Sequence, residues 1–216
     1  MRPKVIVNCA MSADGKIASR LRKQTRLSDE ADMARVHRLR NDCDAILVGI
    51  GTVMADDPSL LVKEKYVDEV KQPVRVVLDS KCRISSDAKV LKPGSRTIVV
   101  VTEGNSRDVP GAEVITIGSG SHIDLCLLLE KLSEMGINSL LIEGGGETIW
   151  SFVKSGLVDE FKVFISSKLI GGAMAPSPVD GEGFGSEDEF TQLTLKSTKL
   201  SDSGILLEFV ADNFNK

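Results

Sequence analysis

Histidine and cysteine are scarce in this chain of 216 residues, which has two histidines and four cysteines. A zinc site needs several of these ligands in a cluster, so the sequence predicts no metal centre, and the zinc-deaminase signature is also missing. No C-x-x-C motif occurs, and three of the cysteines lie in or beside apolar runs, which favours buried free thiols over disulfides. The residues concerned are His37, His122, Cys9, Cys43, Cys82 and Cys126.

Aromatic residues make up only 4% of the chain, and the net charge is −4. Few aromatics argue against a base-stacking surface for single strands, and the mild negative charge gives no general attraction to nucleic acid or anionic membranes. The apolar run near the N-terminus, residues 5–11, is too short for a signal peptide's apolar region or for a membrane span. We therefore expect a cytoplasmic protein that holds any phosphate-bearing ligand with local Lys and Arg.

Apolar, β-branched runs recur along the chain and predict strands. The expected strands are 5–10, 45–48, 74–78, 97–101, 113–117, 139–142, 160–165, 193–200 and 205–210. Between them, amphipathic or capped segments predict helices. One helix follows an N-cap at Ser28 and places Met33, Val36, Leu39 and Cys43 toward the core, and the others are expected at 52–56, 123–135 and 147–155.

Strands alternate with helices up to about residue 165, and the last two strands flank the turn Asp202-Ser203-Gly204. This order predicts one α/β domain over residues 1–216, with a mostly parallel central sheet, flanking helices and a C-terminal antiparallel hairpin. Ligands of such sheets bind at the carboxyl ends of the strands. The residues that follow each strand are therefore the candidates for a functional site.

Two of these strand ends are rich in glycine. Gly49-Ile50-Gly51-Thr52 follows one strand, and Glu143 with three glycines, Glu147 and Thr148 follows another. Glycines allow close approach of a ligand, and free N–H groups at a helix start attract phosphate. Neither turn matches the Rossmann fingerprint or a P-loop. Tight turns without a ligand are the alternative, but two such turns in one sheet favour a dinucleotide or phosphate site.

Charged residues lie near other strand ends. Residues 79–83, Asp-Ser-Lys-Cys-Arg, follow the third strand, where two cations and a hydroxyl could bind a 2′-phosphate or form a solvated turn. Arg40 and Lys63 could each clamp a second phosphate or be ordinary surface charges. Glu143 follows an apolar run, so its carboxylate needs a partner, which a ligand or the glycine turn could supply.

Taken together, these segments resemble the riboflavin-specific reductases, the archaeal and fungal single-domain enzymes and the C-terminal domain of the bacterial deaminase-reductase. The similarity covers nearly the whole chain in collinear order. The matching motifs are Asn8-x-Ala10-x-Ser12-x-Asp14-Gly15-Lys16-Ile17, Val48-Gly49-x-Gly51-Thr52-Val53-x-x-Asp56-Asp57-Pro58-x-Leu60, Pro73 to Ser80, Ile142 to Gly146, Gly156 to Glu160 and Gly171-Gly172.

The resemblance implies a dihydrofolate-reductase-like fold, a homodimer, NADPH as cofactor and 2,5-diamino-6-ribosylamino-4(3H)-pyrimidinone 5′-phosphate as substrate. In the reaction it implies, the ribosylamine opens to an imine and hydride is delivered to C1′, which gives the ribitylamino compound. It also implies that Arg40, Leu60, Lys63 and Glu143 contact the substrate, with Glu143 as the catalytic positioning group. The implied cofactor contacts are Ala10, Thr52, Asp56, Ser80, Lys81, Cys82, Arg83, Gly144, Gly145, Gly146, Glu147 and Thr148.

Two other functions stay open at this point. Dihydrofolate reductase shares the implied fold and normally has an acidic residue on its first helix, where this chain has Asp29, Glu30 and Asp32. A non-catalytic nucleotide-binding module would bind NADPH without turning over a pyrimidine phosphate. Where this chain has Lys63, the bacterial members of the family that it resembles have Arg. A lysine ammonium is a point charge and cannot form the two parallel hydrogen bonds that an arginine guanidinium gives to a phosphate.

Overall fold

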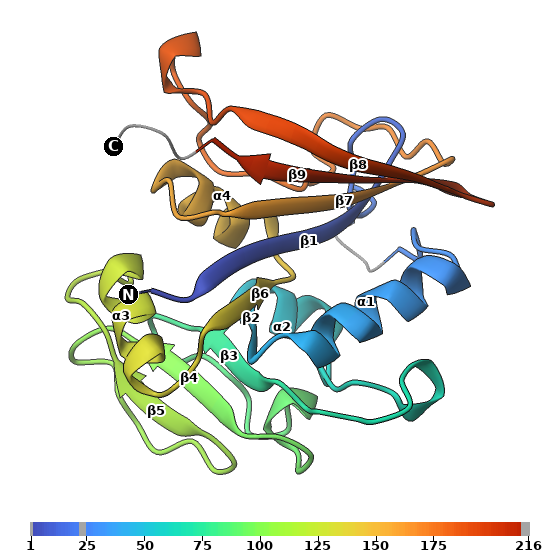
Figure 1. Ribbon diagram of the computed structural model, residues 1–216. Coiled ribbons are helices and arrows are strands. Elements are labelled where there is room, and N and C mark those ends of the chain that lie inside the picture. Colours follow the sequence, from blue (N-terminus) through green and yellow to red (C-terminus); the bar gives the residue numbers. More distant parts are fainter. Residues whose placement is uncertain (1, 22–24, 213–216) are drawn as a thin grey trace. The chain divides into compact units, whose positions relative to one another are not determined.

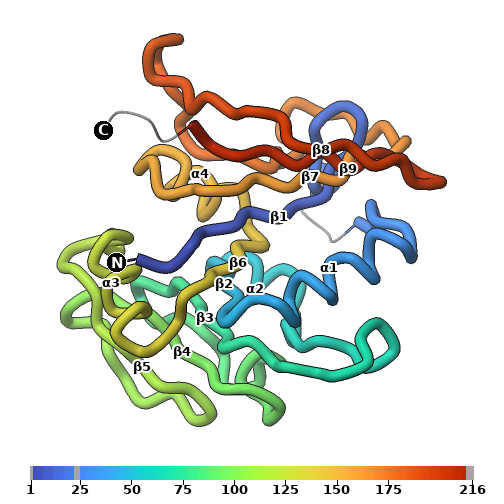
Figure 2. Tube along the Cα trace, viewed as in Figure 1, coloured from blue at the N-terminus to red at the C-terminus, as the bar shows by residue number. Residues whose placement is uncertain are grey.

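The computed structural model describes residues 2–21 and 25–212, and the chain forms two compact units (Figures 1 and 2). The first unit comprises the residues up to Lys4 together with Val36–Leu141. The second comprises Val5–Arg35 and the residues from Ile142 onward. Helix α1, Glu30–Asp42, contributes its first residues to the second unit and its later residues to the first.

The sheet of the first unit has the strand order β5-β4-β3-β2-β6 (Figure 1). Three neighbouring pairs, β2 with β3, β3 with β4 and β4 with β5, are parallel. All residues of β2 and β4 are buried, as expected for parallel strands covered on both faces. The strands are β2 (Ala45–Gly49), β3 (Val74–Leu78), β4 (Thr97–Val101), β5 (Glu113–Thr116) and β6 (Ser139–Ile142).

Short helices join these strands. They are α2 (Ile50–Asp56), α3 (Leu125–Glu134) and the 3-10 turns Glu64–Tyr66 and Lys89–Leu91. Helix α3 buries Leu128, Leu129 and Leu132, which lie on one face at helical spacing. The side chain of Asp124 caps its first turn by accepting from the Leu127 amide.

In the second unit the strand order is β1-β7-β9-β8, shown from blue through orange to red in Figure 2. Strand β1 is parallel to β7, whereas β9 is antiparallel to both β7 and β8. The predicted C-terminal antiparallel hairpin is therefore confirmed. The elements are β1 (Lys4–Ser12), α4 (Gly146–Lys154), β7 (Glu160–Ser166), a 3-10 turn (Glu187–Glu189), β8 (Leu193–Ser201) and β9 (Gly204–Ala211).

Two boundaries differ from the sequence predictions. The N-cap of α1 is Asp29 rather than Ser28, because the Asp29 carboxylate accepts from the Asp32 amide at 2.8 Å and its carbonyl accepts from the Met33 amide at 2.9 Å. Helix α2 begins at Ile50, two residues earlier than expected, because it follows β2 without an intervening turn.

All four cysteines are free; Cys43 and Cys82 are buried, whereas Cys9 is half-buried and Cys126 is exposed, so burial does not hold for every cysteine in an apolar run. Among the helices of the described residues, none combines the length and apolar character that crossing a bilayer requires. In the same part of the chain, no three His, Cys, Asp or Glu side chains gather where they could hold a metal ion.

Arg75 is a buried cation in β3, with 1% of its surface exposed. Its guanidinium donates to three main-chain carbonyls, those of Ser59 (3.4 Å), Lys92 (2.9 Å) and Ser95 (2.6 Å). Burial lowers the pKa of Arg75. Within residues 2–21 and 25–212 no carboxylate pairs with it, so carbonyl dipoles balance its charge. The side chain thereby joins the loop after α2 to the loop before β4.

We predict that Arg75→Leu lowers the free energy of unfolding by about 2–4 kcal/mol, because three main-chain carbonyls lose a donor that ties two loops together. Urea unfolding followed by circular dichroism measures this difference. Arg96→Leu is the matched control, since it removes an exposed arginine that pairs with Glu113 and should cost at most about 1 kcal/mol. Equal midpoints for the two variants would contradict the role given to Arg75.

In the second unit, Asp14 joins the turn after β1 to the loop after β7. Its Oδ1 accepts from the Ser12 hydroxyl (2.6 Å) and the Ile170 amide (3.0 Å), and its Oδ2 accepts from the Gly171 amide (2.6 Å). These bonds, with that from Ser12 foremost, lower the pKa of Asp14 from 3.8 to about 2. The predicted motif Gly171-Gly172 is therefore anchored by an exposed carboxylate.

A carboxylate with a lowered pKa stabilises the fold above its unfolded value of 3.8 and ceases to do so as the pH falls through about 2. We therefore predict that Asp14→Asn lowers the melting temperature at pH 6, and that the difference from the parent protein shrinks steadily between pH 4 and pH 2. Thermal melts across this range measure the effect. A difference that is constant with pH would show that the Asp14 charge has no part in it.

Candidate active site

At the carboxyl end of β2, helix α2 begins directly on glycine. Its N-cap, Gly49, offers no side chain to the first turn. Gly51 is exposed, and a Cβ at this position would have no neighbour within 4 Å. Packing within the described residues therefore does not require glycine at position 51. This is the pattern expected where a ligand approaches the backbone.

The loop after β3 is built around Asp79, whose side chain is completely buried. Its Oδ2 accepts from the Ile84 amide at 2.8 Å, and its carbonyl accepts from the Cys82 amide at 2.8 Å. Cys82 is buried and has a φ of +50°, so the chain turns tightly here. From outside the loop, Arg107 donates to the carbonyls of Cys82 (3.1 Å) and Ile84 (2.6 Å).

The two cations of this loop face solvent. Lys81 is exposed, and the Arg83 side chain is 52% exposed, with its Nε 3.6 Å from Asp79 Oδ1. Ser80 is half-buried, and its carbonyl accepts from the amide and hydroxyl of Thr102. The main chain of this loop therefore carries two exposed cationic side chains, of which Arg83 also forms an ion pair with Asp79.

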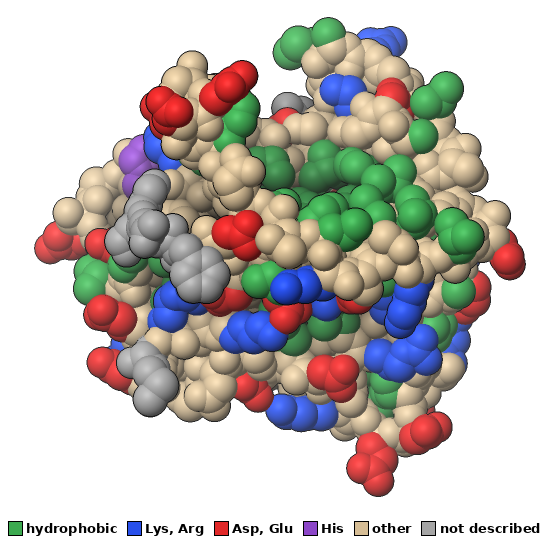
Figure 3. Space-filling view, turned by 45° about the horizontal axis from the view of Figure 1, so that its top comes forward, with side chains coloured by type: hydrophobic (Ala, Val, Ile, Leu, Met, Phe, Trp, Pro, Cys, Tyr) green, Lys and Arg blue, Asp and Glu red, His purple; other side chains and the backbone are tan. Residues whose placement is uncertain are grey.

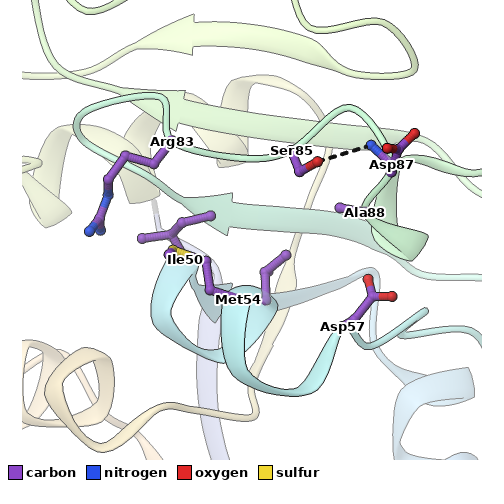
Figure 4. Close-up of a pocket in the computed structure, with 8 residues that line it drawn as sticks. Ile50, Met54, Asp57, Arg83, Ser85, Asp87 and Ala88 are labelled. Atoms are coloured by element: carbon purple, nitrogen blue, oxygen red, sulfur yellow. Dashed lines mark hydrogen bonds between the residues drawn. The ribbon is translucent and has the colours of Figure 1, made fainter.

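A pocket of about 360 Å³ lies between α2 and this loop (Figure 4). Figure 4 shows Ile50 and Met54 of α2 extending toward the loop, with Arg83 at one end of the pocket and Asp57 at the other. Met54 is 65% exposed, so its side chain is accessible to a ligand in the pocket. The lining residues are Ile50, Val53, Met54, Asp57, Arg83, Ser85, Asp87 and Ala88.

An apolar wall beside a cation and a hydroxyl suits a flat heteroaromatic ring that carries an anionic group. Of the predicted cofactor residues, Arg83 lines this pocket, whereas Thr52 and Asp56 are half-buried elsewhere on α2. Burial raises the pKa of Asp56. Cys82 belongs to the loop, and its side chain is buried rather than facing the pocket.

The predicted substrate residues of the first unit belong to α1 and to the segment after α2. Arg40 donates from Nη1 to the Leu61 carbonyl at 3.4 Å. Leu60 is 3% exposed and has a φ of +57°, so its side chain packs inside the unit. Lys63 is exposed. The structure thus brings Arg40 into contact with the segment that carries Lys63. Leu60, at the start of the same segment, has its side chain buried.

The second unit holds the other predicted residues. Ala10 lies in β1, half-buried and opposite Phe164 of β7, and Glu143 is half-buried directly after β6. Helix α4 has Gly145 as an N-cap that gives no side-chain bond, while the Gly145 carbonyl accepts from the amides of Thr148 and Ile149. Glu147 is exposed and Thr148 half-buried.

The three glycines before α4 have different roles. Gly144 has a φ of +123°, a conformation that favours glycine. At Gly146 an added Cβ would lie 2.7 Å from the Ser177 carbonyl oxygen and 2.9 Å from Asp180 Cβ. Packing against residues 177–180 therefore requires glycine at position 146, and the predicted contact of Gly146 with a cofactor stays a prediction.

The acidic residues at the start of α1 have partners within the second unit. The Asp32 carboxylate accepts from Arg35 Nε at 2.8 Å, and Arg35 also donates to Asn8. The Asp29 carboxylate accepts from the hydroxyls of Ser201 and Ser203 in addition to capping the helix. These contacts give both residues a structural role, so their presence does not favour a dihydrofolate reductase.

Sequence reasoning missed most of the pocket lining, including Ile50, Met54 and Ser85. The helical spacing of Ile50 and Met54 directly after a glycine-ended strand was a usable signal for the apolar wall. Arg107 was also missed, and no local signal connects it with a loop that lies more than 20 residues earlier in the chain.

These units define an α/β protein of the dihydrofolate-reductase-like class, in agreement with solved structures. A structure from Thermotoga maritima, described as a diaminohydroxyphosphoribosylaminopyrimidine deaminase/5-amino-6-(5-phosphoribosylamino)uracil reductase, matches with a TM-score of 0.82 and 28% identity. The match covers 97% of this chain and 57% of that longer protein. Residues 3–207 match the model of the RibD C-terminal domain, and the chain belongs to that family.

Curated relatives cover nearly the same span. A protein of Archaeoglobus fulgidus is 43% identical over 195 residues, which is 85% of this chain and 89% of the relative. A protein of Methanothermobacter thermautotrophicus is 41% identical over 214 residues, 97% of this chain and 98% of the relative. Both are named 2,5-diamino-6-ribosylamino-4(3H)-pyrimidinone 5′-phosphate reductase. The family resemblance stated from the motifs is confirmed.

Proposed function

We propose that this chain reduces 2,5-diamino-6-ribosylamino-4(3H)-pyrimidinone 5′-phosphate to its ribitylamino form in riboflavin biosynthesis, with NADPH as the reductant. The observation that carries the proposal is the match, over most of both chains, to two reductases of that name at 41% and 43% identity. An oxidoreductase of this family requires a nicotinamide cofactor. The choice of NADPH over NADH, and this chain's own substrate, are the parts that experiments must test.

The pocket beside α2 supports a dinucleotide. Its apolar wall fits a base, and the half-exposed guanidinium of Arg83 fits a phosphate on the adjoining ribose. Lys81, Ser80 and the uncapped start of α2 would add donors. When bound, the cofactor supplies the hydride. In the second unit, Gly144, Gly145 and the start of α4 are the cofactor contacts that the family resemblance implies.

The chain's own task in this reaction is to bind and orient the sugar phosphate. Lys63 and Arg40 would neutralise the 5′-phosphate, and Glu143 would accept hydrogen bonds from the pyrimidine or the sugar. Reduction of the ring-opened imine adds hydride at C1′ and a proton at the exocyclic nitrogen, and water would supply that proton. Holding both reactants in register lowers the entropic part of the barrier.

The proposal includes one reductase domain formed by residues 1–216, a cytoplasmic location and a homodimer. Strand β8 is the last strand in the order of its sheet and exposes Leu193 (39%), Leu195 (51%) and Leu200 (88%). In Figure 3, hydrophobic side chains gather on the side of the second unit where β8 and β9 lie. Exposed apolar side chains on an edge strand support pairing with a second copy.

Turnover of the enzymatically prepared pyrimidinone phosphate tests the proposal. We expect oxidation of NADPH, measured at 340 nm, and a product about two mass units heavier than the substrate, because one hydride and one proton are added. Dihydrofolate is the control substrate and should support no oxidation. Binding of NADPH without turnover of the pyrimidinone phosphate would instead identify a nucleotide-binding module.

Lys63→Ala should raise the KM for the pyrimidinone phosphate by about 10-fold or more while lowering kcat less, because an anchored phosphate contributes mainly uniform binding. Steady-state kinetics with varied substrate at saturating NADPH measure both constants. Lys71→Ala, which removes an exposed lysine paired with Asp44, serves as the control. An unchanged KM would remove Lys63 from the phosphate site.

Arg83→Ala should raise the KM for NADPH by about 10-fold and leave the KM for NADH within about 2-fold, because only NADPH carries the 2′-phosphate. The two cofactors are varied separately at saturating substrate. Arg96→Ala, at an exposed arginine paired with Glu113, is the control for loss of a surface cation. Equal losses with both cofactors would place the 2′-phosphate elsewhere.

A further inference from the structure

The segment from Leu60 to Tyr66 has an unusual main chain, because side chains provide most of its hydrogen bonds. The Val62 amide donates to Gln72 Oε1 at 2.8 Å, and the Val62 carbonyl accepts from Gln72 Nε2 at 3.0 Å. The Leu61 carbonyl accepts from Arg40. The segment pairs with no strand of the sheet. Its conformation therefore depends on a few side chains rather than on a ladder of backbone bonds.

His37 of α1 provides the bond to Lys63. The imidazole is 1% exposed, and its Nδ1 accepts the Lys63 amide at 3.3 Å. An imidazole nitrogen that accepts a hydrogen bond carries no proton, so this contact requires an unprotonated Nδ1. The ring also stacks on Tyr66, with centroids 4.6 Å apart and planes 14° from parallel. The stack fixes the plane of the imidazole, and so the direction in which Nδ1 points.

Lys63 is thereby held at both ends of its own main chain. Its amide is bound by His37, and its carbonyl accepts from the Tyr66 amide at 3.1 Å, which closes the 3-10 turn of Glu64–Tyr66. The side chain, in contrast, is exposed. A lysine has a long, flexible stem, so the position and direction of its Cα–Cβ bond determine which space its ammonium group samples.

We infer that His37 is a positioning residue for substrate binding, which orients Lys63 toward the substrate phosphate by accepting its main-chain amide. The inference rests on the proposed function, in which Lys63 anchors the 5′-phosphate. His37 is buried, so a direct contact with the ligand is not the route of its effect. The effect passes through one hydrogen bond to Lys63 and belongs to substrate affinity rather than to the chemical step.

The test is a double-mutant cycle with His37→Phe and Lys63→Ala. Phenylalanine preserves a ring that can stack on Tyr66 but has no acceptor. We expect His37→Phe to raise the KM for the pyrimidinone phosphate by about 3- to 10-fold, as loss of one hydrogen bond implies, with kcat and the KM for NADPH within about 2-fold. In the Lys63→Ala background the same change should have almost no further effect on KM.

If the fold-increases in substrate KM caused by the two single substitutions multiply in the double variant, the inference is overturned, because His37 then acts independently of Lys63. A fall in kcat, or an equal rise in the KM for NADPH, would also overturn it and indicate a general structural role. His122→Phe makes the same replacement at the exposed histidine and is the matched control.

A second pair of variants decides the matter if His37→Phe does not fold. Asparagine can place an acceptor oxygen where Nδ1 lies, whereas the glutamine oxygen lies one bond farther from the backbone. We expect His37→Asn to keep the substrate KM within about 2-fold and His37→Gln to raise it about 3- to 10-fold. Equal KM values for the two variants would contradict the inference.

Failure of the inference and failure of the proposed function give different results. If the parent protein does not turn over the pyrimidinone phosphate at all, the proposed function fails. If the parent turns it over and Lys63→Ala raises KM, but His37→Phe folds and leaves KM unchanged, the proposed function stands and only the role of His37 is lost.

Discussion

The constraint that shapes this molecule is the need to satisfy main-chain hydrogen bonds in the irregular segments between its strands and helices. Such a segment has no neighbouring ladder of backbone bonds to pair with. In this protein, buried polar side chains supply the missing partners. Asp79 binds the loop after β3, and His37 binds the segment after α2. Arg75 binds both the segment after α2 and the loop before β4.

This arrangement makes the candidate site rigid at the backbone and variable at its side chains. Lys81 and Arg83 extend from a loop whose turns are fixed by Asp79 and Arg107, and Lys63 extends from a segment fixed by His37. Ordering a loop on binding costs conformational entropy that a preformed loop does not pay. A reductase that must align two phosphorylated molecules benefits from such preformed loops, because small errors of alignment reduce rate steeply.

The regular elements could be predicted from the sequence because their signals are local. Strands 74–78, 97–101 and 139–142 have the predicted bounds, since each is an apolar run between turn residues. The start of α1 was misplaced by one residue because Ser28 and Asp29 are both good caps, and only the geometry selects between them. The packing that requires glycine at position 146 was not predictable, because its close neighbours at 177–180 are distant in sequence.

The candidate site was predictable in part. The sequence placed residues 79–83 and 49–52 correctly at strand ends, and Arg83 and Ile50 from these segments line the pocket. The burial of Leu60 and the side-chain bonds to residues 61–63 were not predictable, because they depend on α1 and on Gln72, which the sequence pattern does not connect with that segment. Local patterns thus identified which residues bear charge, and tertiary contacts determine how they are held.

Amide hydrogen exchange in the ligand-free protein tests the central claim most directly. The amides of Val62, Lys63 and Ile84 lie outside any strand or helix and donate to side chains. The account predicts that, before any cofactor is added, these amides exchange at least about 100-fold more slowly than in an unstructured peptide. Exchange at the unstructured rate, with protection arising only when NADPH and substrate bind, would show that the ligands rather than buried side chains organise these loops.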